Sequence, residues 1–280
     1  MIRLISWNMK HLPSWDELAK SGVDVALLQE VPTPTASSVG LEPDPRILEV
    51  LPGGDNAWRT AGWERRDWRT AVARLSASVQ LDPIATADVA TCDWETLMVS
   101  RTGTLTAADV VVDDRVVFTA VSVYAPWERP LGRNKPMWAD ASAHRLLSDL
   151  TPLLWDQRRR PVLVAGDWNI LYRYGEYDDP EFRDRYATVF DRADALGLRF
   201  VGPQHPDGRQ ADPWPDELPR ESKCVPTYYH SRQTAATATR QLDFVFASAS
   251  LADRVHTEAR NEPAEWGSSD HCRISIEVDA

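Results

Sequence analysis

The chain has 280 residues, of which 43% are hydrophobic and 26% are charged, and its formal net charge is −11. This balance is that of a folded globular protein and excludes a disordered, collagen-like or low-complexity chain. The negative charge disfavours sequence-independent binding along a nucleic-acid duplex, because most of that affinity comes from Lys and Arg side chains that neutralise phosphates. Acidic enzymes can still act on nucleic acids where a local basic cleft or bound metal ions supply positive charge.

The three cysteines, Cys92, Cys224 and Cys272, are odd in number and none lies in a CxxC spacing. This pattern argues against a disulfide framework or a structural zinc site and fits a protein of the reducing cytoplasm. The opening residues, MIRLISWN, lead directly into a strand-like segment. We therefore expect neither a secretory signal nor a membrane-inserted segment, and nothing in the sequence indicates an obligate protein partner.

The first half of the chain has the pattern of short strands with one capped helix. Ser14 and Glu17 have the spacing of a capping box, which predicts a helix that ends near Gly22. Asp113 and Asp114 are suited to a hairpin turn. In chain order we expect strands at Ile2–Trp7 and Val23–Leu28, a mostly irregular stretch at Thr33–Gly54 with a short helix near Arg46–Leu51, and strands at Val72–Leu75, Leu97–Ser100, Val110–Val112 and Arg115–Tyr124.

Two segments rich in arginine invite a nucleic-acid interpretation. The stretch before Leu75 carries Trp58, Trp63 and Trp68 among five arginines, and Arg158–Arg160 is an arginine triplet. Tryptophan and arginine can stack on bases or grip phosphates, although the rings more often pack in a core and the arginines stay solvated. For the triplet, the favoured interpretation is that it complements a helix C-terminus and keeps the loop solvated.

The second half of the chain alternates helices and strands. Its longest structureless stretch, rich in Pro, Asp, Glu and Gly, has the character of a lid or specificity loop. In chain order we expect a helix at Ala139–Trp155, a strand within Pro161–Ile170, a helix at Asp179–Leu196 closed by Gly197, a strand at Leu198–Val201, the structureless stretch Gly202–Ser222, paired strands at Pro226–Tyr229 and Gln241–Ala247 around a linker at Thr234–Thr239, and a terminal strand at Cys272–Val278.

The strand within Pro161–Ile170, PVLVAGDWNI, ends in Gly166 and then presents Asp167 and Asn169. A carboxylate and an amide at the mouth of a buried strand are suited to hold a water, a metal or a phosphate. The alternative is that both residues only cap the following segment.

Other polar side chains also occur at strand boundaries. Asp243 lies among Leu, Phe and Val, where a charge is costly unless it has a partner. The remaining residues of this kind are Asn8, Glu30, Tyr124, Asp270 and His271.

Taken in order, these motifs resemble the endonuclease/exonuclease/phosphatase superfamily, which includes deoxyribonuclease I-like enzymes, exonuclease III-type abasic-site endonucleases, inositol polyphosphate 5-phosphatases and neutral sphingomyelinases. The resemblance runs from Asn8 to His271 and implies one domain over residues 1–280. It implies an α/β (α+β) fold, a four-layer α/β sandwich in which two mixed β-sheets pack face to face with helices outside. The motifs are Asn8 after the first strand, Glu30 in LLQE, Tyr124 in YAP, Asp167 and Asn169 in GDWN, Asp243 in QLDFVF, and Asp270 with His271 in SSDH.

The resemblance also implies a magnesium-dependent phosphoesterase, with Mn²⁺ as a possible substitute. Glu30 would be the principal ligand of the metal, and Asn8 and Asp270 would complete its surroundings. These side chains offer hard oxygen ligands, which suit either ion.

The remaining motif residues are assigned to the reaction itself by the same resemblance. Asp167 would orient or deprotonate the attacking water, while Asn169 and Tyr124 would donate hydrogen bonds to the phosphate. His271, kept charged by a buried Asp243, would stabilise the transition state. Asp243 would thereby obtain the partner that its position requires.

Three departures from the superfamily pattern bear on the substrate. Lys10 stands where abasic-site endonucleases usually carry an acidic residue, which suggests a cation facing phosphate. Arg240 replaces the Trp of a usual Trp-Arg-Leu-Asp motif and removes one wall of a pocket for a base-less sugar. Tyr124 stands where the deoxyribonuclease and sphingomyelinase branches usually place a second histidine. His11 and Lys10 follow Asn8 closely enough to line the cleft.

A nuclease acting on DNA or RNA is the function favoured by Tyr124, Lys10 and the tryptophan–arginine segment. The alternative is a phosphatase or phosphodiesterase of a small or lipid-linked phosphate, which the charge of −11 favours. An inactive binding module is the third reading, although every core catalytic position is present. His144 lies on the expected amphipathic helix and matches no motif, so a structural role is expected there.

Overall fold

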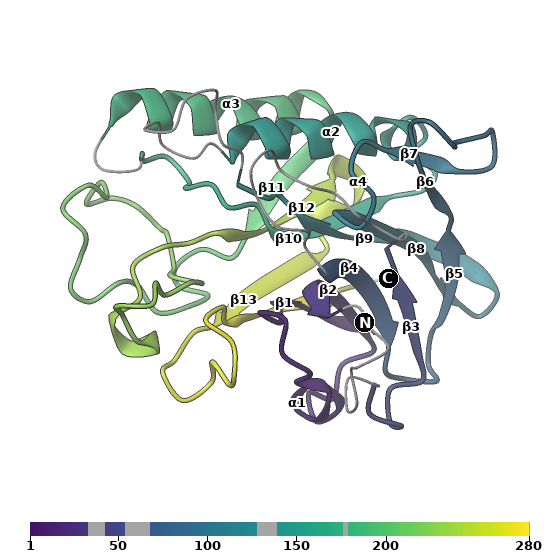
Figure 1. Ribbon diagram of the computed structural model, residues 1–280, viewed down its shortest axis with the longest axis horizontal. Helices are drawn as coiled ribbons and strands as arrows, with labels where there is room; N and C mark the ends of the chain where they lie inside the picture. The colour runs from purple at the N-terminus through teal and green to yellow at the C-terminus, as the bar shows by residue number, and fades with distance from the viewer. Residues whose placement is uncertain (33–42, 54–67, 128–138, 176–178, 280) are drawn as a thin grey trace.

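A computed structural model of the protein describes residues 1–32, 43–53, 68–127, 139–175 and 179–279 (Figure 1). The interpretation of Trp58 and Trp63 as nucleic-acid contacts falls outside these ranges. Two six-stranded sheets, each mixed in strand direction, carry the architecture.

The first sheet contains both the first and the last strand of the chain. Its one parallel pair joins β1 to β2, and its other neighbours are antiparallel. In spatial order its strands are β13 (Val255–Arg260), β14 (Arg273–Val278), β1 (Ile2–Asn8), β2 (Val25–Pro32), β4 (Trp68–Arg74) and β3 (Glu49–Pro52).

The second sheet is built from the middle of the chain. Strands β9 and β10 are parallel, and the other neighbours are antiparallel. In spatial order its strands are β11 (Leu198–Gly202), β12 (Asp243–Ser248), β10 (Val162–Asp167), β9 (Arg115–Tyr124), β8 (Leu105–Val112) and β5 (Gln80–Ile84). A separate parallel pair joins β6 (Thr86–Asp88) to β7 (Leu97–Val99).

Alternation along the strands explains why the sheets pack in layers. In β10, Val164 packs with the residues of helices α2 (Asp140–Leu154) and α3 (Pro180–Ala195), while Ala165 packs against the first sheet. Figure 1 shows the two helices lying across the outer face of the second sheet. On the outer face of the first sheet, the short helix α1 (Trp15–Ala19) buries its apolar side chains. The expected four-layer sandwich is confirmed.

Several expected elements are confirmed with small changes of boundary. Both helices of the second half form, and the Asp179 side chain caps α3 by accepting a hydrogen bond from the backbone N–H of Glu181 at 2.9 Å. Asp113 and Asp114 have φ values of 48° and 59°, which a type I′ hairpin turn requires. Residues 203–222 contain neither helix nor strand, as expected. The 3₁₀-helix η2 (Ala235–Thr237) lies within the expected linker, and the short helix α4 (Ala249–Ala252) follows β12.

Other predictions are wrong because tertiary partners override local signals. The capping box does not form: the Ser14 hydroxyl bonds that of Ser268 at 2.6 Å, and Glu17 pairs with Arg273 instead. The short helix at Arg46–Leu51 is also wrong, since β3 lies at the edge of the first sheet.

The strand pairing expected between Pro226–Tyr229 and Gln241–Ala247 is wrong as well. Strand β12 pairs with β10 and β11, whereas Tyr228 makes only isolated bridges, to Arg240 and His271. The sequence patterns also missed β5, β6, β13 and α4.

All three cysteines are free, as their spacing predicts. Within the described part of the chain, no helix combines the length and the apolar character needed to cross a bilayer.

Candidate active site

Three predicted site residues lie in one row across the second sheet. Asp167 ends β10, and the strand register places it beside Tyr124 of β9 and Asp243 of β12. The close approach of β9 requires a glycine before Asp167, because a Cβ on Gly166 would lie 1.9 Å from the carbonyl oxygen of Val123. The GD dipeptide is therefore a structural requirement of this sheet as well as a motif.

The first sheet contributes the other side of the site through the ends of β1, β2 and the start of β14. Asn8 pairs with Gln29, and the next residue, Glu30, has a left-handed backbone with φ of 50°. The Ser269 hydroxyl donates to the carbonyl of Asn8 at 2.7 Å and accepts from the backbone N–H of His271 at 3.1 Å. The two sheets thus bring all the predicted site residues to one end of the sandwich.

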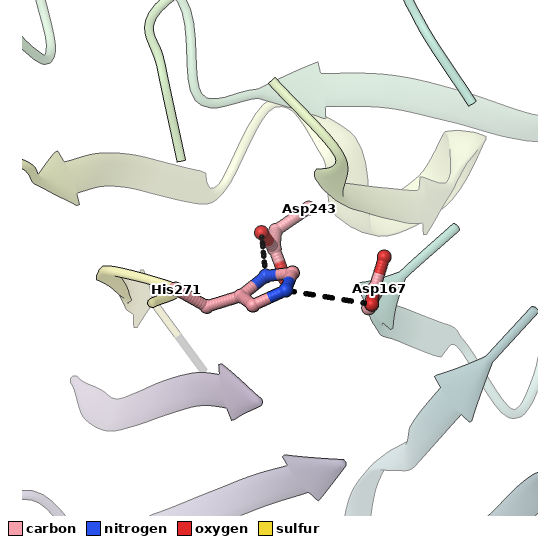
Figure 2. A group of neighbouring side chains, drawn as sticks. All are labelled: Asp167, Asp243 and His271. Carbon is pink, nitrogen blue, oxygen red and sulfur yellow. Dashed lines mark hydrogen bonds and ion pairs between the residues drawn. The ribbon is translucent and has the colours of Figure 1, made fainter. Parts of the chain in front are cut away.

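His271 lies between two aspartates, and we call Asp243, His271 and Asp167 the Asp–His–Asp cluster (Figure 2). The Nδ1 atom of His271 is 2.9 Å from Oδ2 of Asp243, and its Nε2 atom is 3.8 Å from Oδ2 of Asp167. All three residues are at most 5% exposed. The partner that Asp243 was expected to need is His271.

Burial and charge act against each other within this cluster. Burial opposes the charged form of His271, but the neighbouring carboxylates of Asp243 and Asp167 raise its pKa to about 10. Burial also raises the pKa of Asp167 to about 8, with His271 lowering it and the charges of Asp243 and Glu30 adding to the rise. The two neighbouring carboxylates therefore favour the charged, imidazolium form of His271.

The carboxylate of Asp167 is held by three amide donors, two of them on Oδ2, the oxygen nearest His271. It accepts from Nδ2 of Asn8 at 3.0 Å, from Nδ2 of Asn169 at 3.1 Å and from the backbone N–H of Asn169 at 2.9 Å. The Asn169 side chain also donates to the carbonyl of Ala125 at 3.1 Å. Asn169 therefore orients Asp167 here, and its expected hydrogen bond to phosphate stays a prediction.

Glu30 and Asp270, which we call the carboxylate pair, lie closer to solvent, with side chains 14% and 19% exposed. Nε2 of His11 lies 2.9 Å from Glu30 Oε2, and Nζ of Lys10 lies 3.1 Å from Asp270 Oδ2. Burial opposes ionisation of Glu30, but the hydrogen bond from His11, the charges nearby and a hydrogen bond from Tyr124 lower its pKa. The lowered pKa favours the ionised form of the Glu30 carboxylate.

The donor set around the carboxylate pair fits a hard divalent cation. Glu30 and Asp270 offer carboxylate oxygens, and Oδ1 of Asn8 offers an amide oxygen that accepts from the backbone N–H of Lys10 at 2.9 Å. The Asp–His–Asp cluster also has metal-compatible spacing, with ligand atoms within 4.8 Å of one another. It is the poorer choice for a hard cation, because Mg²⁺ prefers oxygen ligands and Nδ1 of His271 is already hydrogen-bonded to Asp243.

A cavity of about 610 Å³ opens over both groups. Of the predicted site residues, Asn8 and Asp243 do not line the cavity. His144, for which a structural role was expected, lies elsewhere, 3.0 Å from the hydroxyl of Thr188. The lining residues are Lys10, His11, Glu30, Tyr124, Trp127, Asp167, Asn169, Phe182, Tyr228, His230, Arg240, Leu242, Asp270 and His271.

Sequence reasoning missed the aromatic part of this cavity. Tyr228 packs on the His271 ring, with centroids 4.9 Å apart and planes inclined by 45°, and Trp127 and Phe182 lie on the same cavity wall. No motif marks these residues, because they come from a loop, a helix and an isolated bridge that only the fold brings together. The expectation that Lys10 and His11 line the cleft is confirmed.

No protein-family model and no curated protein matches the sequence, but solved structures match its fold. The catalytic domain of Xenopus laevis APE2 is 15% identical with a TM-score of 0.65, over 99% of this chain and 91% of that one. An AP endonuclease from Archaeoglobus fulgidus is 16% identical with a TM-score of 0.63, over 100% of both chains. The endonuclease domain of TRAS1, a telomere-specific non-LTR retrotransposon, is 13% identical with a TM-score of 0.58, over 100% of this chain and 99% of that one.

These similarities extend over the whole length of the chain. The protein therefore shares the sandwich fold of these three structures.

Proposed function

We propose that this chain is a divalent-metal-dependent nuclease that hydrolyses phosphodiester bonds in DNA. One observation carries the proposal: Asp167 and His271 of the buried Asp–His–Asp cluster line the same cavity as the carboxylate pair. Two of the three similar structures are named as endonucleases and the third as the catalytic domain of APE2, which supports DNA as the substrate. Because the site draws on both sheets, we further propose that residues 1–280 act as one domain.

In this proposal Asp167 positions the attacking water and takes its proton. Its carboxylate lies on the cavity wall, and the amides of Asn8 and Asn169 fix its orientation. Burial raises the pKa of Asp167, so that in its ionised form this carboxylate is a stronger proton acceptor than an ordinary aspartate. Asn8 and Asn169 then act as positioning residues.

His271 would stabilise the negative charge that develops on the phosphoryl oxygens. The neighbouring carboxylates favour its charged form, and Asp243 holds Nδ1 so that Nε2 is turned toward Asp167 on the cavity wall. Tyr124, on the neighbouring wall, would donate a hydrogen bond to the phosphate. These groups are preorganised, since they need no rearrangement when charge develops.

Glu30, Asp270 and Asn8 would hold the metal, with Mg²⁺ the preferred ion and Mn²⁺ a substitute. When bound, the ion supplies positive charge to the phosphate and to the leaving oxygen. The lowered pKa of Glu30 keeps this ligand ionised at neutral pH.

A second candidate, a phosphodiesterase of a small or lipid-linked phosphate, is favoured by the net charge of −11. A molecule of this charge gains little from a long polyanion outside its cleft. A small ester would need only the cavity of about 610 Å³.

A substrate screen tests the proposal. Plasmid, single-stranded and abasic-site duplex DNA, and in parallel RNA and small phosphate esters, are incubated at low salt with Mg²⁺ or Mn²⁺ or with a chelator. Metal-dependent cleavage of DNA that disappears in Asp167→Asn supports the nuclease. If small esters are hydrolysed while every DNA substrate stays intact, the second candidate replaces it.

A further inference from the structure

Two consecutive side chains, Lys10 and His11, each contact one member of the carboxylate pair. Lys10 Nζ is 3.1 Å from Asp270, and His11 Nε2 is 2.9 Å from Glu30. Both contacts are on the cavity wall, and the two donor side chains are 46% and 43% exposed. The carboxylates are thus more buried than the donors that cover them.

The backbone holds these two residues in place at an energetic cost. Lys10 and His11 have φ values of 51° and 57°, a left-handed conformation that is unfavourable for a residue other than glycine. The turn is fixed by hydrogen bonds from the His11 N–H to the carbonyl of Glu30 at 3.1 Å and from the Leu12 N–H to the carbonyl of Met9 at 2.9 Å. The ring of His11 also packs on Trp68, with centroids 4.0 Å apart.

The charge of Lys10 opposes a divalent ion at the same carboxylates. A cation bound by Glu30 and Asp270 must share or displace the ammonium of Lys10 and the N–H of His11. Two positive charges held close together repel each other, and less strongly where solvent reaches them. Conversely, positive charge at the cavity mouth attracts a phosphate, which a strongly acidic protein otherwise repels.

We propose that Lys10 and His11 form a latch on the carboxylate pair. The latch orients Glu30 and Asp270, competes with the divalent metal for their oxygens, and presents its N–H groups to the substrate phosphate once the metal has taken those oxygens. This inference rests on the proposed function for the location of the metal. It assigns Lys10 and His11 as residues that lower metal affinity and raise phosphate affinity.

Isothermal titration of chelator-treated protein with Mn²⁺ alone tests the competition. We expect Lys10→Gln and the double variant K10Q/H11Q to bind Mn²⁺ about tenfold or more tightly than the wild-type protein. Lys10→Arg keeps the charge and should retain the wild-type affinity. Lys20→Gln removes the same charge from an exposed pair with Asp16 and should also leave the affinity unchanged.

Titration of the Mg²⁺-saturated proteins with inorganic phosphate tests whether Lys10 and His11 contribute to phosphate binding. We expect phosphate to bind at least fivefold more weakly to Lys10→Gln than to the wild type or Lys10→Arg. Thermal unfolding in chelator checks that each variant is folded, which we expect because both contacts are half-exposed.

The latch is overturned if the folded double variant binds Mn²⁺ no more tightly than the wild type, or not at all, or if Lys20→Gln tightens binding equally. Unchanged phosphate affinity in Lys10→Gln overturns the phosphate-facing role. These titrations do not depend on turnover. A protein that shows the latch but cleaves no DNA would refute only the nuclease proposal, and active nuclease without the affinity change would refute only the latch.

Discussion

The two walls of the cavity are held by different means. The Asp–His–Asp cluster is buried, and Asp243 and His271 are hydrogen-bonded to each other within the protein. The carboxylate pair is closer to solvent and is held by the flexible, half-exposed side chains of Lys10 and His11. The side chains of the Asp–His–Asp cluster are therefore fixed in place, and we call this side of the cavity the preset wall. The carboxylate pair can exchange its hydrogen-bond partners, and we call its side the exchangeable wall. This division suits a site in which the charge-stabilising groups stay fixed while ions and substrate enter and leave.

The strongest test of the preset wall is Asp167→Asn. We expect turnover to fall about a thousandfold or more, because the amide cannot accept the proton of a water. Steady-state kinetics on the substrate found by the screen measure the effect. Asp253→Asn, at an exposed carboxylate near Arg199, is the matched control and should keep full activity. Retention of a tenth of the activity by Asp167→Asn would remove Asp167 from the reaction.

A smaller effect is expected for Asp243→Asn, about a hundredfold in kcat, because His271 keeps its position but loses the charge that stabilises its protonated ring. Asp243 and His271 should act as a unit. The double variant of Asp243→Asn with His271→Ala should then be no slower than His271→Ala alone. Additive losses in this cycle would show that the two side chains act independently.

The exchangeable wall should respond to metal concentration. Glu30→Gln removes one carboxylate charge from the metal's surroundings, and we expect divalent affinity to fall about tenfold to a hundredfold. Activity should recover in part as Mg²⁺ is raised, which Asp167→Asn should not show. A loss in Glu30→Gln that no concentration of Mg²⁺ relieves would place Glu30 in the reaction and not in metal binding.

The smallest effect is expected where an aromatic ring supports the preset wall. Tyr228→Leu removes the ring that packs on His271 and should lower turnover about threefold to tenfold, with a loss of about 1 kcal/mol in the free energy of unfolding. Tyr229→Leu is the matched control, since Tyr229 packs on Trp266, with centroids 5.1 Å apart. It should lose similar stability in chemical denaturation and keep its turnover. Equal kinetic losses in both variants would mean that Tyr228 has no specific effect on His271.

Patterns set by the local chain predicted much of the fold. The valines before Gly166, the amphipathic helix at Ala139–Trp155 and the Asp113–Asp114 turn each carry their own signal, and each formed as expected. The predictions that failed depended on distant partners. Glu17 has the spacing of a capping box but pairs with Arg273, which is 256 residues away.

The residues of the site likewise fall into those that the local sequence predicts and those that only the fold brings into place. Polar residues at strand ends, such as Asp167 and His271, stand out in a sequence because burial there is costly without a partner. Tyr228 does not stand out, since a tyrosine in a loop has many roles and only the folded chain places its ring on His271. The contacts of Lys10 and His11 could not be predicted from the sequence either. They depend on a left-handed turn, and the turn contains no glycine that would indicate such a conformation.

The row formed by Tyr124, Asp167 and Asp243 makes the site sensitive to strand register. In a sheet, a shift of one residue turns every side chain to the opposite face. A slip of β10 against β9 or β12 would separate these three groups and turn the valines of β10 away from their packing partners. Activity therefore requires the correct register of the central strands. A chain that folds into a compact state with β10 out of register would be inactive.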